Sequence, residues 1–248
     1  MKQTLLEQIH RTNDAERALF GAVRVKFNDC LDRWYSDLRP DQVNNNFFVP
    51  VGDYAQGDIE AAIACQRARG LDYLMLRQTE PMDGALREKF GFEEEITYVM
   101  ALRQDAGPRW KQNAAIEIRD IQTSDIGEDL LDVSSVPEQY QAISRRNMEL
   151  VLKVAREHPE YHWLCAYQDG VRVGTVYALC HEGCVEMDDL WVAPAYRGKY
   201  IATTLMKYIA EQFPGTLYLH ADAAKTPREM YGKMGFEIVE TVYEYYRP

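Results

Sequence analysis

A short basic loop joins an acidic strand to a helix in the second half of the sequence. The stretch VEMDDLWVAPAYRGKYIATTLM, residues 185–206, breaks at Pro194, and Arg197, Gly198 and Lys199 follow just before a helical pattern begins. The first backbone N–H groups of a helix lack partners within the helix and carry partial positive charge, so they bind phosphate. The two basic side chains add to that attraction. These residues therefore predict an anion-binding corner suited to a nucleotide-like pyrophosphate.

Two carboxylates precede this loop on the same strand. Glu186 and Asp188 are two residues apart, so the alternation of a strand places both on one face, whereas Asp189 points to the other. A carboxylate held there can act as a general base, directly or through water. A solvated acidic strand, or the wall of a groove that attracts cations, explains the same residues equally well.

The elements that must position these residues follow from the hydrophobic pattern. Residues 116–120 alternate as a strand, Thr123, Ser124 and Asp125 offer N-caps for a short helix, and a longer helix is expected from 137 to about 157. Further strands are predicted over 162–168, 171–179, 184–192 and 216–222, helices over 200–212 and 227–233, and a final strand after Gly235. This order predicts an α/β fold whose mixed, mostly antiparallel sheet is flanked by helices, with a helical crossover after the fourth strand.

The first half of the chain repeats part of the second in degraded form. LREKFGFEEEITYVMAL, residues 86–102, resembles MYGKMGFEIVETVYEYY, residues 230–246, and a helix and a strand precede each. At the place of the basic loop, residues 49–58 carry two Asp and neither Arg nor Lys, so we expect no phosphate there. The charged stretch around Gly107 and Pro108 reads as a linker. We therefore predict domains at 1–104 and 115–248 with a linker at 105–114.

Composition limits the classes of partner and the compartment. The chain has 248 residues, a formal net charge of −11 and five cysteines. An acidic chain is a poor non-specific ligand for nucleic acid. The sequence contains no run of about 18 apolar residues, so no membrane span is predicted. The N-terminus lacks the pattern of a secretory signal, and an odd number of irregularly spaced cysteines indicates reduced thiols, so we expect a cytoplasmic protein. Cys180, His181 and Cys184 are better explained by a hairpin turn than by a metal site.

The ordered set of motifs in residues 116–248 resembles the GNAT superfamily of acyl-CoA-dependent N-acyltransferases. The superfamily signature is Gln or Arg, two residues, Gly, one residue, then Gly or Ala, and here it reads RGKYIA from Arg197 to Ala202. Leu190, Trp191, Val192 and Pro194 precede it, and YGKMGF, residues 231–236, follows about a helix and a strand later. The first half resembles only the C-terminal portion of the same fold. The resemblance implies a tandem GNAT-like protein with a degenerate N-terminal member.

The resemblance implies acetyl-CoA as the acyl donor and no metal. The expected cofactor-binding residues are those at the end of the acidic strand and in the basic loop: Leu190, Trp191, Val192, Arg197, Gly198, Lys199, Tyr200, Ile201, Ala202 and Thr203. In the family the strand carries a bulge, which falls here near 190–192, and the amide of Val192 would polarise the thioester carbonyl.

The reaction implied is acetyl transfer to the primary amine of a small molecule or peptide, by direct attack in a ternary complex. Glu186 or Asp188 would take the proton of the ammonium, and Tyr231 would protonate the departing thiolate. The alternative is a non-catalytic acyl-CoA sensor or protein-interaction module. In a third interpretation the degenerate half replaces the second subunit of a dimer, so the protein is expected as a monomer or a homodimer.

Two residues depart from the family pattern and favour the non-catalytic alternative. Tyr200 occupies the position at which the family prefers Gly, and Ala224 stands where the family often has Asn. A residue at a helix start has a negative φ, so we expect Tyr200 to adopt the required backbone without strain.

Overall fold

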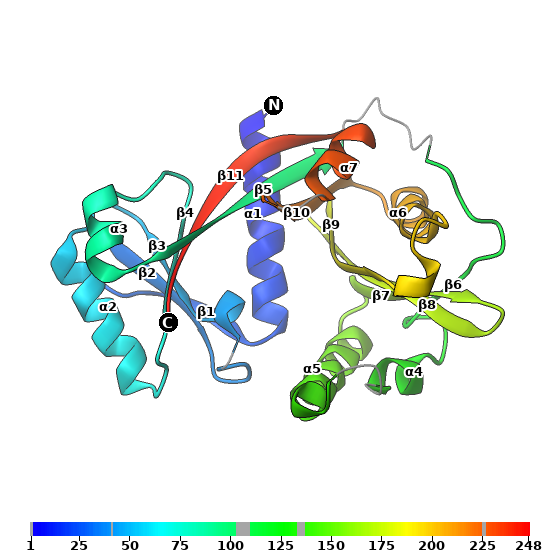
Figure 1. Ribbon diagram of the computed structural model, residues 1–248, viewed down its shortest axis with the longest axis horizontal. Coiled ribbons are helices and arrows are strands. Elements are labelled where there is room, and N and C mark those ends of the chain that lie inside the picture. Colours follow the sequence, from blue (N-terminus) through cyan, green and yellow to red (C-terminus); the bar gives the residue numbers. More distant parts are fainter. Residues whose placement is uncertain (1, 41, 103–109, 133–136, 225–226) are drawn as a thin grey trace. The chain divides into compact units, whose positions relative to one another are not determined.

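The computed structural model describes residues 2–40, 42–102, 110–132, 137–224 and 227–248 (Figure 1). The chain forms two compact units, each built from separate stretches. The 101–219 unit also contains residues 1–13 and 234–237, and the 14–100 unit also contains residues 220–233 and 238–248. These units do not follow chain order, and the domain boundaries expected at 104 and 115 stay a prediction. Much of the expected linker, at 105–109, lies outside the described residues.

The 101–219 unit is a mixed sheet with helices on both faces. Its elements are β6 (Glu117–Asp120), α4 (Gly127–Leu131), α5 (Glu138–Glu157), β7 (Tyr161–Gln168), β8 (Val171–His181), β9 (Cys184–Val192), the 3-10 turn η2 (Pro194–Tyr196), α6 (Ile201–Gln212) and the start of β10 (Thr216–Asp222). The strand order is β10-β9-β8-β7-β6. β6 to β9 pair antiparallel, and β9 pairs parallel with β10 across the α6 connection. The predicted elements and the crossover are confirmed, but the expected N-caps Thr123, Ser124 and Asp125 are wrong, because α4 begins after Ile126 and has no side-chain cap.

Local turn chemistry explains why β7, β8 and β9 form a meander. Asp169 and Gly170 have φ values of 52° and 78°, and Glu182 and Gly183 have values of 46° and 80°. Two consecutive left-handed residues form the turn whose twist matches paired antiparallel strands. These two turns bring the acidic strand β9 back against β8.

Helix α6 covers one face of this sheet, and α4 and α5 lie across the other (Figure 1). Ile201 and Leu205 of α6 are fully buried and pack closely against β8 at Gly174, where an added Cβ would lie only 3.0 Å from Ile201 Cγ2. On the other side, α5 buries a stripe of apolar residues that contacts β7: Val151, Leu152, Val154 and Ala155. The two apolar helix faces hold the sheet from both sides and fix the start of α6 next to the end of β9.

The 14–100 unit is also built from strands and helices. Its elements are the end of α1 (Lys2–Leu19), β1 (Ala22–Lys26), β2 (Leu31–Ser36), η1 (Val43–Asn45), β3 (Phe47–Pro50), α2 (Gln56–Ala68), β4 (Leu74–Gln78), α3 (Gly84–Phe90), most of β5 (Glu93–Leu102), α7 (Pro227–Lys233) and most of β11 (Phe236–Arg247). The strand order is β1-β2-β3-β4-β11-β5. The series α2, β4, α3, β5 repeats α6, β10, α7, β11, as the internal similarity predicts.

The last strand of the chain lies in the sheet of the 14–100 unit. Residues Tyr243 to Arg247 of β11 pair antiparallel with β4, and Tyr245 is fully buried opposite Leu76. The Tyr245 hydroxyl accepts a hydrogen bond from the Met82 N–H and donates one to Glu94, both at 2.8 Å. The final strand predicted after Gly235 is therefore present, and most of it belongs to the 14–100 unit.

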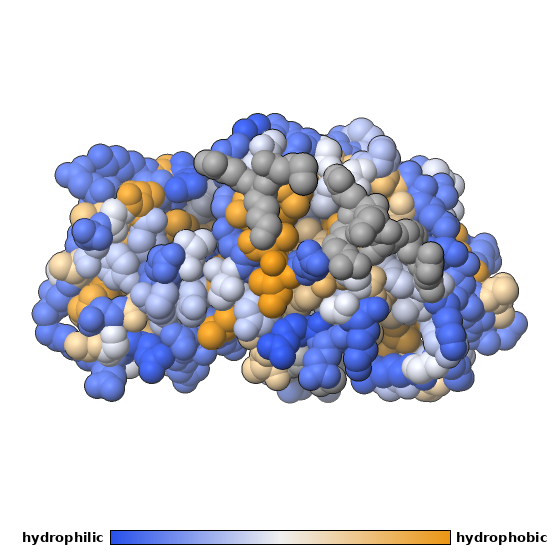
Figure 2. Space-filling model, turned by 90° about the horizontal axis from the view of Figure 1, so that it is seen from above, coloured by the Kyte–Doolittle hydropathy of each residue, from blue (hydrophilic) through white to orange (hydrophobic). Residues whose placement is uncertain are grey.

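Hydrophilic residues cover most of the face shown in Figure 2. Across the described ranges, no helix is long and apolar enough to cross a membrane. The same ranges contain no group of three His, Cys, Asp or Glu side chains arranged to hold a metal ion. All five cysteines are free thiols.

Candidate active site

The pairing of β9 with β10 ends before β9 does. The parallel register runs from Thr216 opposite Cys184 to Leu219 opposite Met187, although β9 continues to Val192. Beyond Met187, the edge of β9 that faces β10 therefore has no strand paired with it among the described residues. A strand edge of this kind can hydrogen-bond an extended ligand as though it were another strand.

Val192 turns its backbone groups toward this unpaired edge. It lies opposite Gly174 of β8, and the next residue, Ala193, donates its N–H to the carbonyl of Val173 at 2.9 Å. In an antiparallel ladder this bond marks Val192 and Gly174 as a non-hydrogen-bonded pair, so the N–H and C=O of Val192 point away from β8. The Val192 carbonyl accepts a hydrogen bond from Arg197 Nε at 3.2 Å.

A β-bulge produces this change of direction. Asp188 lies opposite Tyr177 and Trp191 lies opposite Thr175, so Asp189 and Leu190 together face a single residue of β8. Asp189 is left-handed with φ of 51°, and its N–H is held by Asp188 Oδ1 at 2.8 Å. A bulge of this type twists a strand and re-aims the residues that follow it. It lies one residue before, and overlaps, the region in which we expected it.

The basic loop leads from this strand to α6. After η2, Arg197, Gly198 and Lys199 are exposed, and Gly198 has φ of 76°, which only glycine adopts without strain. The first helical hydrogen bond of α6 is from Thr204 N–H to the Tyr200 carbonyl, at 2.9 Å. The N–H groups of residues 201–203 therefore have no acceptor within the helix. Together with two exposed cations they form a donor set that fits a pyrophosphate.

The backbone conformation of Tyr200 contradicts a prediction from the sequence. Its φ is 61° and its ψ is 19°, which is the left-handed region, so the expectation of a negative φ is wrong. The chain reverses between η2 and α6, and this residue makes the reversal. The family preference for Gly at this position has this physical reason, because L-residues with a large side chain are strained there. The Tyr200 ring is 47% exposed, and Lys111 Nζ lies 5.5 Å from its centre.

Residues 110–115 pass along the start of α6. Thr203 Oγ1 donates to the Lys111 carbonyl at 2.6 Å, and the Asn113 N–H donates to Thr204 Oγ1 at 2.9 Å. Asn113 Nδ2 also donates to the Lys199 carbonyl at 3.1 Å. This segment, which was assigned to the linker region from sequence, therefore holds the loop and the first turn of α6 in place.

The two carboxylates of β9 differ in environment. Glu186 is only 4% exposed, and its register places it opposite Leu179 on β8 and Tyr218 on β10. Asp188 is exposed, and its carboxylate caps the bulge through Asp189. Glu186 is therefore a buried side chain of β9 just before the unpaired edge, whereas Asp188 is exposed and holds the backbone of the bulge.

Sequence reasoning missed the aromatic residues around these carboxylates. Tyr218 is fully buried beside Glu186, and its hydroxyl donates to Asn13 Oδ1 of α1 at 2.8 Å. Tyr177, opposite Asp188, stacks on Tyr161 with ring centres 5.2 Å apart. The excess of tyrosine in the composition was the available signal. It did not identify these residues, because only the strand register brings them to the carboxylates.

Tyr231 and Ala224 belong to the 14–100 unit. Tyr231 lies on α7 and is 9% exposed. Ala224 donates its N–H to Asp222 Oδ1 at 2.8 Å, just after β10. The catalytic role of Tyr231 stays a prediction.

In the first half, the start of α2 is arranged differently from the start of α6. Asp58 in the first turn accepts a hydrogen bond from the Ala55 N–H at 2.9 Å and another from Asn28 Nδ2 at 2.8 Å. A carboxylate of the chain itself therefore occupies the helix start, which repels a second anion. This is the physical difference between the two helix starts.

Residues 125–236 match the model of the Acetyltransferase (GNAT) family. A functionally unknown conserved protein from Staphylococcus epidermidis ATCC 12228 has a similar structure, with a TM-score of 0.76 and 15% identity over 92% of this chain and 94% of its own. A GCN5-related N-acetyltransferase from Kribbella flavida gives a TM-score of 0.60 and 14% identity over 96% and 95%. A tandem GNAT protein from the clavulanic acid biosynthesis pathway gives a TM-score of 0.56 and 14% identity over 96% of this chain and 95% of its own. No curated protein matches the sequence.

At these identities the structural similarity shows the fold, and the family match covers the segment that carries the basic loop. The chain has a tandem GNAT fold, and its residues 125–236 match the model of the acetyltransferase (GNAT) family.

Proposed function

We propose that this protein is an N-acetyltransferase that moves an acetyl group from acetyl-CoA to the primary amine of a small molecule or peptide. The family and fold support acyl-CoA-dependent acetyl transfer in general. The observation that carries the proposal is the unpaired edge of β9, where the Val192 N–H turns away from β8 directly before the basic loop.

The chain supplies a group for each part of acetyl-CoA. The N–H groups of residues 201–203, with Arg197 and Lys199, bind the pyrophosphate, and the edge of residues 190–192 pairs with the pantetheine amides. When bound, acetyl-CoA supplies the activated acyl group as a thioester. The Val192 N–H donates to its carbonyl oxygen, which gains negative charge as the amine attacks, so the strongest stabilisation comes in the transition state.

Glu186 is the favoured proton acceptor. A primary amine has a pKa of roughly 10, so it must lose a proton before it attacks. Glu186 lies on the same face of β9 as Asp188 but inside the sheet, where it can receive that proton directly or through water. Asp188 is the weaker candidate because it caps the bulge. Tyr231 is kept as the acid that protonates the thiolate.

Calorimetric titration with acetyl-CoA and with CoA tests the binding site. We expect micromolar binding by the wild type and about tenfold weaker binding by Arg197→Ala, the loss expected for one charge-assisted hydrogen bond. Lys153→Ala, an exposed position on α5, is the matched control and should bind like the wild type. Equal affinity of Arg197→Ala and the control would refute the assignment of the loop.

A screen of amines by release of free CoA thiol tests catalysis. Glu186→Gln should lower kcat by about 100-fold or more without changing the affinity for CoA, as expected for loss of a general base. Asp188→Asn keeps an oxygen that accepts the Asp189 N–H, so it should retain the fold and most of the activity. A larger loss in Asp188→Asn than in Glu186→Gln would reverse the assignment. Tyr231→Phe should reduce kcat alone.

The alternative function is an acyl-CoA sensor without catalysis. The left-handed Tyr200 in the loop is the observation that favours it, since a large side chain stands where the family prefers none. A wild type that binds CoA but releases no thiol with any amine would support the sensor. Binding gained only in Tyr200→Gly would indicate that the tyrosine closes the loop.

A further inference from the structure

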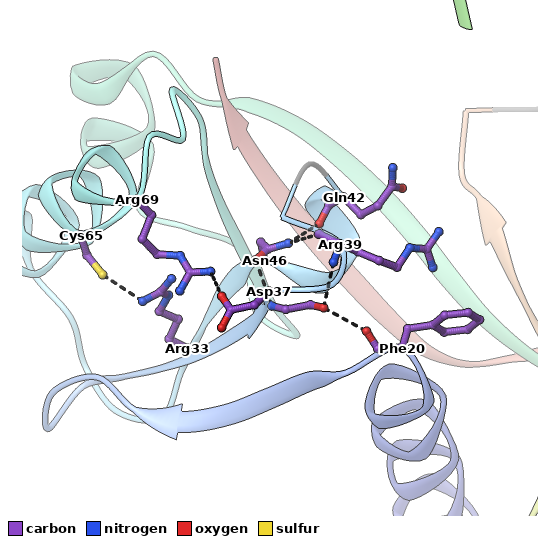
Figure 3. Close-up of polar contacts among 9 residues, drawn as sticks. Phe20, Arg33, Asp37, Arg39, Gln42, Asn46, Cys65 and Arg69 are labelled. Atoms are coloured by element: carbon purple, nitrogen blue, oxygen red, sulfur yellow. Dashed lines mark hydrogen bonds and ion pairs between the residues drawn. The ribbon is translucent and has the colours of Figure 1, made fainter. Parts of the chain in front are cut away.

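A buried arginine contacts a cysteine in the 14–100 unit, far in sequence from the basic loop (Figure 3). Arg33 of β2 is only 9% exposed, and its Nη1 donates to Cys65 Sγ of α2 at 3.2 Å. Cys65 is partly buried and packs against the core that β2, β4 and α2 share. Cys65 is therefore only partly enclosed, whereas the Arg33 side chain that contacts it is buried.

No carboxylate in the described part of the chain forms an ion pair with Arg33. Its Nε and Nη2 have no hydrogen-bond acceptor among the residues that the structure describes. The neighbouring carboxylate, Asp37, is bound to Arg69 at 2.8 Å, as Figure 3 shows. The rings of Tyr35 and Phe48 lie 4.9 and 5.9 Å from the guanidinium and compensate only part of the cost. A buried cation with unused donors strongly favours a nearby negative group.

Cys65 is the group that can supply this negative charge. The two unused nitrogen atoms of Arg33 are closed to solvent, so a dissolved anion does not reach them directly. The sulfur already contacts the same guanidinium, so an oxygen atom bonded to it would lie beside these donors. Peroxides react with the thiolate form of a cysteine, and the unused N–H donors can stabilise the negative charge of an oxygen added to the sulfur.

We infer that Cys65 is a site of oxidation by hydroperoxides, and that Arg33 holds the oxidised sulfur. The thiolate attacks one peroxide oxygen, an S–O bond forms and the O–O bond breaks. Sulfur loses two electrons to the peroxide, and the leaving oxygen takes a proton to give water or an alcohol. The product is a sulfenic acid or its anion, whose oxygen accepts hydrogen bonds from the unused N–H groups of Arg33. A thiol reductant reverses the change.

The other cysteines have no comparable surroundings. Burial raises the pKa of Cys165 to about 12 and those of Cys180 and Cys184 to about 11, which keeps these thiols protonated. Cys30 is the matched comparison, because it is also partly buried against the same core cluster. The Cys30 N–H is held by Asn28, and no arginine is described at its sulfur. A comparison of Cys65 with Cys30 therefore separates the effect of Arg33 from the effect of solvent exposure.

Dilute hydrogen peroxide and dimedone, applied to the folded full-length protein at pH 7, test the inference. Peptide mass spectrometry then measures the rate of sulfenic acid trapping at each cysteine. We expect Cys65 to be labelled about tenfold faster than Cys30, the effect of one hydrogen bond to a charged group. Arg33→Met should lower the labelling rate of Cys65 about tenfold and leave the labelling rate of Cys30 unchanged. Arg69→Met, which removes the neighbouring paired arginine, should leave the preference for Cys65 intact.

Two results would overturn the inference. One is equal labelling of Cys65 and Cys30 in the wild type, a comparison that needs no variant. The other is a rapid Cys65 reaction that persists in a folded Arg33→Met protein. If Arg33→Met does not fold, Arg33→Lys replaces it. The lysine ammonium keeps the charge but lacks the planar fork of donors of a guanidinium, so the labelling rate of Cys65 should be intermediate.

Discussion

Replacing Tyr200 separately with glycine and with alanine measures the strain in the loop before α6. The residue has φ of 61° and ψ of 19°, and its ring is 47% exposed. A non-glycine residue in this region costs about 1–2 kcal/mol, whereas glycine costs about 0.5–1 kcal/mol more backbone entropy than alanine. Both variants lose the same ring contact with Lys111. We therefore expect Tyr200→Gly to be more stable than Tyr200→Ala by about 0.5–1 kcal/mol.

The comparison with the wild type follows from the same numbers. An exposed cation–π contact contributes about 0.5–1 kcal/mol, so Tyr200→Ala should lose this amount. Tyr200→Gly loses the contact but also the strain, so its free energy of unfolding should stay within about 0.5 kcal/mol of the wild type. Urea unfolding followed by circular dichroism and tryptophan fluorescence measures both differences.

A helical position of the opposite character provides the control. Ala64 is exposed in the interior of α2, where φ is negative, so Ala64→Gly should cost about 1 kcal/mol. The preference between glycine and alanine should therefore have opposite signs at positions 64 and 200. If Tyr200→Gly is no more stable than Tyr200→Ala, the left-handed backbone is not the reason that the family prefers glycine here.

Three further variants test the packing and the pH dependence. A Cβ at Gly174 would lie 3.0 Å from both Ile201 Cγ2 and the Trp191 carbonyl oxygen, so Gly174→Ala should destabilise the protein by about 1–3 kcal/mol in urea unfolding. Gly232 in α7 has open space around it, so Gly232→Ala should raise the free energy of unfolding by about 0.5–1 kcal/mol. Burial, with two nearby arginines, lowers the pKa of His220 to about 3, so the folded protein keeps it neutral while the unfolded chain takes up a proton below about pH 6.5. Its contribution to stability is therefore complete above pH 6.5 and is lost toward pH 3, at up to about 1.4 kcal/mol per pH unit, and His220→Gln should flatten the stability curve between pH 6 and 4. An unchanged slope would contradict the buried neutral state.

The sequence alone determined the elements of the second half and their order along the chain. Hydrophobic periods, helix starts and the Asp169–Gly170 turn are local signals, because each acts within a few residues of itself. The spacing of the basic loop, the preceding strand and the later YGKMGF segment was sufficient to indicate the family. The internal similarity also predicted the repeated helix-strand-helix-strand series, since α2 and α6 begin equivalent series.

Only the tertiary structure decided which strand edges meet and how the backbone turns between elements. The partner of β11, the end of pairing between β9 and β10, and the Tyr218 contact with Asn13 join residues far apart in sequence. The left-handed Tyr200 arises because α6 must reverse direction after η2 to pack on the sheet at Gly174. Neither the period of a strand nor that of a helix carries this information, because register and reversal are set by the packing of the whole sheet.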